Sequence, residues 1–262
     1  SEEQKVFYLM IGSVLLGVLV IVAGWGVFTK IRDNKKIKEK NELIQVQKNI
    51  VEVKNIEITD SIQYARRIQN GILPPMKSVQ KALPNSFILY KPKDLVAGDF
   101  YWLEQIGNKT FIAAADCTGH GVPGAFMSMI SSDKLNATVR EQKITSPDLI
   151  LEEVNRGIKK ALKQANDKDS TRDGMDCAIV TINFAQKTML YSGANRPLWI
   201  VRAGELLETK ATKVAVGGLT PTDQKYELHS FEMQSGDQIY LSSDGYADQF
   251  GGEKGKKMKV KK

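Results

Sequence analysis

Two neighbouring runs decide the fold: Val96-Ala97-Gly98-Asp99-Phe100-Tyr101-Trp102-Leu103-Glu104-Gln105-Ile106 and Thr110-Phe111-Ile112-Ala113-Ala114-Ala115-Asp116. Both are typical of β-strands, and Gly107 and Asn108 between them favour a two-residue hairpin turn. Such a loop pairs Ile106 with Lys109, and the same register places Asp99 opposite Asp116. Directly opposed residues have Cβ atoms about 4.5–5.5 Å apart on one face. Two carboxylates held there repel each other unless a cation lies between them, so the pattern indicates a metal site.

The charge of the chain is unevenly distributed. The 262 residues carry a net charge of +7, of which residues 30–40 hold +4 and residues 253–262 hold +5, leaving −2 for the remainder. A nucleic-acid-binding protein is expected to carry its basic surface on the folded domain, so the composition argues against nucleic acid as a partner. Cys117 and Cys177 both lie in apolar runs, which is typical of buried thiols in a reducing compartment.

The N-terminal part contains an apolar run long enough to cross a membrane. Residues 7–28 include no charged side chain, and at 1.5 Å per residue a helix of that length spans a hydrocarbon core of about 30 Å. A cleaved signal peptide is the alternative, but the run is too long and lacks a small-residue cleavage pattern. Only Lys5 precedes the run, whereas six basic residues follow it. The positive-inside rule therefore predicts a single-pass anchor over residues 1–29 in the inner membrane, with the rest of the chain in the cytoplasm.

Residues 30–75 are expected to form a helical linker. Leu43, Val46, Ile50 and Val53 have the 3-4-3 spacing of a coiled-coil seam. An amphipathic helix lying on its own domain would show a similar stripe. We favour a parallel homodimeric signalling helix, which Pro74-Pro75 ends.

The remaining residues, 76–262, alternate between strand and helix patterns. Strands are predicted over residues 86–90, 177–184, 188–192, 198–202 and 238–242, in addition to the hairpin, and helices over 124–140 and from 146 onward. Hairpins and helices in separate runs predict the α+β class, as an αββα sandwich of antiparallel sheets flanked by helices.

Five motifs occur in order across this region. They are Val96-Ala97-Gly98-Asp99-Phe100-Tyr101, Ala115-Asp116-Cys117-Thr118-Gly119-His120-Gly121-Val122-Pro123-Gly124-Ala125, Gly174-Met175-Asp176, Ser192-Gly193-Ala194-Asn195, and Gly236-Asp237 followed by Ser243-Asp244-Gly245. Together they resemble the PPM-type serine/threonine phosphatases, specifically the bacterial SpoIIE branch, over about residues 58–255. Each motif alone is weak, and the ordered set is specific.

The resemblance implies a centre of two divalent ions. In it Asp116 bridges the ions, Asp99 binds the second, the backbone carbonyl of Cys117 adds a contact, and Asp244 binds the first. Oxygen ligands suit Mn²⁺ or Mg²⁺. Two such ions lower the pKa of a water and orient it for attack on phosphorus. The implied substrate is phosphoserine or phosphothreonine on a regulatory protein, such as an anti-sigma-factor antagonist.

Several roles stay open at this level. His120 could act as a general acid or as a structural hydrogen-bonding group. Asp173 and Asp176 could serve a third, weaker ion site, although Asp176 could simply begin a strand. For the whole chain, the alternative to an enzyme is a catalytically silent signalling adaptor that binds a phosphoprotein without cleaving it.

The C-terminal end differs from the family pattern. Members of the family close with a further helix and a strand whose aspartate completes the first metal site, whereas this sequence ends in a lysine-rich run at Lys262. We therefore expect a phosphatase domain truncated at its C-terminus, with weak metal binding in this chain and robust activity in a longer one.

Overall fold

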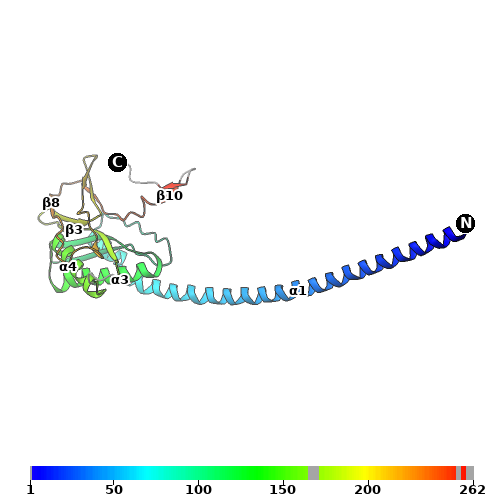
Figure 1. Ribbon diagram of the computed structural model, residues 1–262. Helices are drawn as coiled ribbons and strands as arrows, with labels where there is room; N and C mark the ends of the chain where they lie inside the picture. Colours follow the sequence, from blue (N-terminus) through cyan, green and yellow to red (C-terminus); the bar gives the residue numbers. More distant parts are fainter. Residues whose placement is uncertain (1, 165–170, 252–254, 258–262) are drawn as a thin grey trace. The chain divides into compact units, whose positions relative to one another are not determined.

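The computed structural model of the protein describes residues 2–164, 171–251 and 255–257. Most of the lysine-rich run at residues 253–262 therefore lies outside the described residues. The chain divides into two compact units, one ending at Asp60 and the other beginning at Ser61. Figure 1 shows the helical first unit in blue and the mixed second unit in cyan through green and yellow to red.

Helix α1 is one continuous element from Glu2 to Asn70. It contains the predicted apolar run and most of the predicted linker, and it ends a few residues before Pro74-Pro75. Among the described residues it is the one helix long and apolar enough to cross a membrane, with a mean hydropathy of 2.7 over its most apolar 18 residues. The apolar side chains of this run and of the coiled-coil seam are exposed in the single chain.

The second unit is built around two antiparallel sheets. The larger sheet contains β1 (Phe100–Ile106), β2 (Lys109–Cys117), β3 (Gly174–Asn183), β4 (Thr188–Ala194) and β8 (His229–Glu232) in that order, with β7 (Val216–Gly217) also paired to β3. The smaller sheet has the order β6 (Glu205–Thr209), β5 (Leu198–Arg202) and β9 (Gln238–Tyr240). A short hairpin, β10 (Phe250–Gly251) with β11 (Lys256–Lys257), lies outside both sheets.

Each face of the larger sheet is covered by a different layer. Strand residues alternate between two faces, so Phe111 belongs to one buried cluster and its neighbour Ile112 packs against another. The first cluster joins the sheet to α3 (Gly121–Asn136), the π-helical turn η1 (Ala137–Glu141) and α4 (Pro147–Ala161). The second cluster joins it to the smaller sheet through residues such as Leu198 and Ile200. The α+β class and the stacked antiparallel sheets flanked by helices are therefore confirmed.

The segment before β1 differs from the prediction. Residues 86–90, Ser-Phe-Ile-Leu-Tyr, are expected to form a strand, yet they lie outside every described strand. Phe87 and Leu89 are instead 74% and 69% exposed. A strand requires a neighbouring strand for its backbone groups, and a short apolar run by itself does not supply one. The short helix α2 (Met76–Ala82) precedes this segment.

Candidate metal centre

The hairpin register places the first two predicted site residues at one end of the larger sheet. Ile106 pairs with Lys109 and Phe100 with Ala115, so the predicted register is confirmed from Phe100 to Ile106. The strand begins at Phe100 and not at the expected Val96, so Asp99 lies just beyond the paired residues. Asp99 lies one residue before β1, and Asp116 is the penultimate residue of β2. On the other side of β2, Asp116 pairs directly with Asp176 of β3. The sheet thus brings three carboxyl groups to neighbouring strand ends.

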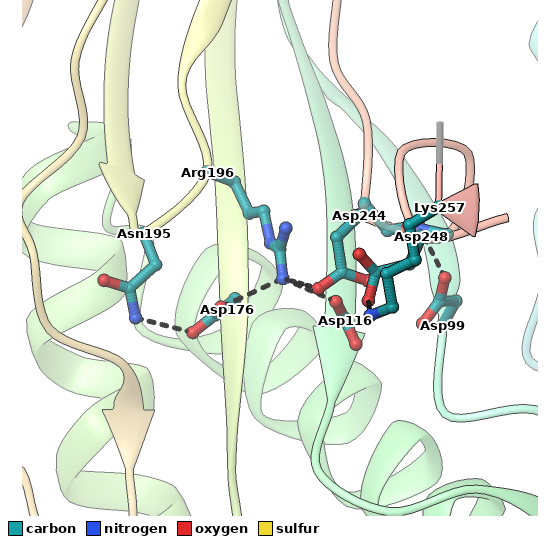
Figure 2. A network of polar contacts seen from close by, with 10 residues as sticks. Asp99, Asp116, Asp176, Asn195, Arg196, Asp244, Asp248 and Lys257 are labelled. Carbon is teal, nitrogen blue, oxygen red and sulfur yellow. Dashed lines mark hydrogen bonds and ion pairs between the residues drawn. The ribbon is translucent and has the colours of Figure 1, made fainter. Parts of the chain in front are cut away.

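Asp244 reaches the same place from the loop that follows β9. A single nitrogen, Nη2 of Arg196, lies 2.7 Å from Asp116 Oδ2, 2.8 Å from Asp244 Oδ2 and 3.1 Å from Asp176 Oδ2. Figure 2 shows the guanidinium pointing into this group of carboxylates from the turn after β4. Because three aspartates meet one nitrogen, they share a common cation position.

Asp99 is held by the same loop through a different contact. Ser243, the residue before Asp244, donates its hydroxyl to Asp99 Oδ2 at 2.6 Å. The hydroxyl of Tyr90 donates to the backbone carbonyl of Asp99 at 3.2 Å. Asp99 is therefore linked, through Ser243, to the loop that carries Asp244, although the two aspartates are far apart in sequence.

The backbone carbonyl of Cys117 lies next to Gly98, and its thiol is buried in the core. The thiol is buried and hydrogen-bonded to Ser131 at 3.6 Å, and burial raises its pKa to about 12. A Cβ on Gly98 would stand 2.8 Å from the carbonyl oxygens of both Cys117 and Gly119. Only glycine allows the chain before Asp99 to pass this closely, so Gly98 permits the approach of the two predicted ligand segments.

The electrostatics of the cluster are unfavourable for unpaired carboxylates. Burial, then the neighbouring charges of Asp99 and Asp244, raise the pKa of Asp116 to about 8, while Arg196 acts in the opposite direction. A carboxyl group with such a raised pKa lacks sufficient positive charge around it. The carboxylate oxygens suit Mn²⁺ or Mg²⁺, and their convergence on one point fits a small cation. Among the described residues, however, no set of three acidic, histidine or cysteine side chains already has metal-binding geometry.

The three residues whose roles were left open, Asp176, Asp173 and His120, lie in different surroundings. Asp176 belongs to the cluster, where Asn195 donates to its Oδ1 at 2.8 Å. Asp173 instead accepts a hydrogen bond from Thr118 at 3.0 Å, and no described contact joins it to Arg196. His120 precedes α3 with its Nδ1 3.3 Å from Asp94 Oδ2, and its side chain is 88% exposed.

Two further residues contact the predicted ligands and were not predicted from the sequence. Arg196 directly follows the fourth motif, and Ser243 opens the second half of the fifth. The available signal for Arg196 was its position directly after the fourth motif. Ser243 gave none, because a serine before Asp-Gly is typical of an ordinary turn.

The last turn of α1 also contacts the backbone near Asp99. Gln69 is buried and donates from Nε2 to the carbonyl of Ala97 at 2.5 Å and to Ser128 Oγ at 2.8 Å. The amide of Ala97 donates in return to Gln69 Oε1 at 3.1 Å. One side chain thus joins the end of α1, the segment before Asp99 and α3.

Comparisons with known proteins agree with this geometry. Residues 106–261 match the family model described as Stage II sporulation protein E (SpoIIE). The SiaA-PP2C domain of Pseudomonas aeruginosa is 31% identical, with a TM-score of 0.70 and 79% of each chain covered. A comparison with curated protein sequences gave no match.

Two further solved structures are similar at lower identity. The PP2C phosphatase domain of SpoIIE from Bacillus subtilis, with a fragment of its regulatory domain, is 21% identical with a TM-score of 0.47, covering 59% of this chain and 43% of that one. The RsbU and RsbW domains of Rv1364c from Mycobacterium tuberculosis are 20% identical with a TM-score of 0.48, covering 61% and 42%.

An α+β sandwich with aspartates gathered at its strand ends defines the class of PP2C-type, metal-dependent serine/threonine phosphatases. The family-model match covers more than half of the chain, and the SiaA domain exceeds 30% identity over most of it. This chain belongs to the SpoIIE family of protein phosphatases.

Proposed function

We propose that the chain is a membrane-anchored phosphatase that hydrolyses phosphoserine or phosphothreonine on a regulatory protein, and that Asp99, Asp116, Asp244 and the Cys117 carbonyl hold its two divalent ions. The observation that carries the site assignment is the convergence of Asp116 and Asp244 on one cation position, 2.7 and 2.8 Å from the same nitrogen. Asp99 joins them through the contact of Ser243.

The protein's own residues have distinct tasks in this proposal. Divalent ions, when bound, supply positive charge for the phosphoryl oxygens and lower the pKa of a water. Asp116 is central because it pairs with Asp176 of β3 and has Asp99 as a charged neighbour. The partly buried position of Asp116 limits competing water and strengthens its interaction with a cation. Asp244 lies on a loop and is 48% exposed, so it can adjust to the ligand without moving the sheet.

The proposal extends to the rest of the chain. The apolar part of α1 anchors the protein in the inner membrane, with the phosphatase domain in the cytoplasm. The seam at Leu43, Val46, Ile50 and Val53 joins two copies in parallel and relays a signal to the catalytic domain. The family resemblance supports a phosphorylated regulatory protein as substrate, such as an anti-sigma-factor antagonist.

Hydrolysis of a phosphoserine peptide by the full chain in detergent micelles tests the enzymatic part. We expect activity that depends on Mn²⁺ or Mg²⁺ and falls more than about 100-fold in Asp116→Asn, because even changes beside metal ligands cost 10–100-fold. Asp133→Asn is the matched control, since Asp133 is an exposed aspartate of α3. Binding of the peptide without hydrolysis under either metal would instead support the silent adaptor.

A further inference from the structure

Arg196 supplies the positive charge within the cluster of predicted metal ligands. Its side chain is 15% exposed, and its Nη2 is the atom shared by Asp116, Asp176 and Asp244. Asp99, Asp116, Asp176 and Asp244 together bring four carboxyl groups to this end of the sheet. One guanidinium therefore faces more negative charge than it can neutralise.

The guanidinium is poorly matched to these partners. One Nη2 carries two hydrogens, yet three carboxylate oxygens lie within 3.1 Å of it. Within the described part of the chain, the buried Nε of Arg196 has no hydrogen-bond partner. Arginine binds carboxylates best through two parallel N–H donors, and this arrangement uses one nitrogen. A compact cation with several coordination positions suits three converging oxygens better.

The backbone of Arg196 is firmly held, so the side chain is the movable part. The Tyr191 hydroxyl donates to the Arg196 carbonyl at 2.7 Å, and it does so over Gly193, where a Cβ would collide with both groups. Asn195 has a φ of 57°, in the left-handed region that asparagine tolerates. This turn aims the long, flexible stem of Arg196 at the cluster, and rotation about that stem can withdraw the guanidinium while the turn stays in place.

We infer that Arg196 is a built-in competitor of the metal: its guanidinium holds Asp116 and Asp244 together when no ion is bound, and it must leave these oxygens before a divalent ion can bind them. This inference rests on the proposed function, because it assumes that Asp116 and Asp244 are metal ligands. The cluster then always contains a cation, and the affinity for metal is lower than the carboxylates alone would give.

Competition predicts two opposite effects of one substitution. Arg196→Met removes the charge and keeps most of the stem. Without its competitor, the cluster binds Mn²⁺ on the order of tenfold more tightly, since the contacts of a charged donor no longer have to be broken. With a chelator present, the same variant is less stable than the wild type, because its carboxylates face each other without a cation. If the role of Arg196 were purely structural, Arg196→Met would lower both the Mn²⁺ affinity and the stability.

The test measures both quantities on the full chain in detergent micelles. Free Mn²⁺ is followed by electron paramagnetic resonance during titration, and urea unfolding in EDTA is followed by tryptophan fluorescence. Arg196→Gln is a second neutral variant, in case methionine disturbs the fold, and Arg196→Lys restores a charge and should return the Mn²⁺ affinity toward the wild-type value. Arg202→Met is the matched control: Arg202 pairs with Asp237 at 2.7 Å, outside the cluster, and its loss should leave the Mn²⁺ affinity unchanged.

The outcomes distinguish this inference from the proposed function. Tighter Mn²⁺ binding by either neutral variant, together with lower stability in EDTA, supports competition. Equal or weaker Mn²⁺ binding in both folded neutral variants overturns it, while loss of binding in Asp116→Asn would keep the proposed metal site. If the wild type and Asp116→Asn bind Mn²⁺ equally, the metal site itself is wrong and the inference fails with it.

Discussion

At Asp116, burial and the charges of two neighbouring carboxyl groups act in the same direction, and together they raise its pKa to about 8. In the unfolded chain the same carboxyl titrates near its ordinary value of about 3.9. Between these two values the folded protein holds a proton that the unfolded protein has released. The folded state is therefore stabilised by protonation, and this contribution is lost as the pH rises through about 8.

We expect the free energy of unfolding in EDTA to fall as the pH rises from 5 to 8, and the fall to be smaller in Asp116→Asn. Chemical denaturation at several pH values measures this. Asp133→Asn, which changes an exposed carboxyl, should keep the wild-type slope. Identical slopes in the wild type and Asp116→Asn would show that Asp116 holds no proton in this range.

The sequence predicts the register from Phe100 to Ile106 because a two-residue turn determines the pairing of the hairpin. The sequence does not predict the position of the Arg196 guanidinium. The position of that guanidinium depends on the turn after β4, on the left-handed Asn195 and on the contact between Tyr191 and the Arg196 carbonyl. These are contacts between residues that no periodicity relates.

Helix α1 ends beside the backbone segment that carries Asp99. Gln69 in its last turn satisfies both the amide and the carbonyl of Ala97, two residues before Asp99. Its contact with Ser128 adds the adjacent helix α3. A change in the last turn of α1 that moves Gln69 is therefore expected to move the backbone that carries Asp99.

Replacing Gln69 with alanine should leave the buried amide and carbonyl of Ala97 without their side-chain partner, at a cost of about 1–3 kcal/mol for an unsatisfied group. We expect lower stability of the catalytic domain and weaker Mn²⁺ binding. Urea denaturation and Mn²⁺ titration measure the two effects. Gln63→Ala is the matched control, because Gln63 is an exposed glutamine of the same helix. Equal values for the two variants would refute a link between the end of α1 and Asp99.

Helices and strands were predicted correctly where the local sequence pattern is sufficient to specify them. The hairpin strands and the amphipathic helix α4 follow from local spacing. Residues 86–90 show the limit: their apolar and aromatic side chains are typical of a strand, but whether a strand forms depends on an open sheet edge that the local sequence does not describe.

On the scale of the whole molecule, we expect the full chain in detergent micelles to be a dimer. Leu43, Val46, Ile50 and Val53 expose an apolar seam that a partner helix would bury. Analytical ultracentrifugation at micromolar concentration measures the mass. A charge at two seam positions, Val46→Asp with Val53→Asp, should give a monomer, whereas Gln45→Asp on the polar side should not. A monomeric wild type would contradict the relay through the linker.

The order of the motifs along the chain identified the family before any contact was known, and the family match and the SiaA domain confirm it. What the motifs could not show is the state of the centre. They name Asp99, Asp116 and Asp244, but the cation that the structure places among the aspartates is Arg196.

The most direct test of the central claim is an anomalous scattering experiment on crystals of the protein soaked in Mn²⁺. We predict two peaks about 3.5–4 Å apart, bounded by the carboxylates of Asp99, Asp116 and Asp244, with the Arg196 guanidinium withdrawn from them. No peak beside Asp116 in crystals that contain Mn²⁺ elsewhere would contradict the assignment of these aspartates as the metal centre.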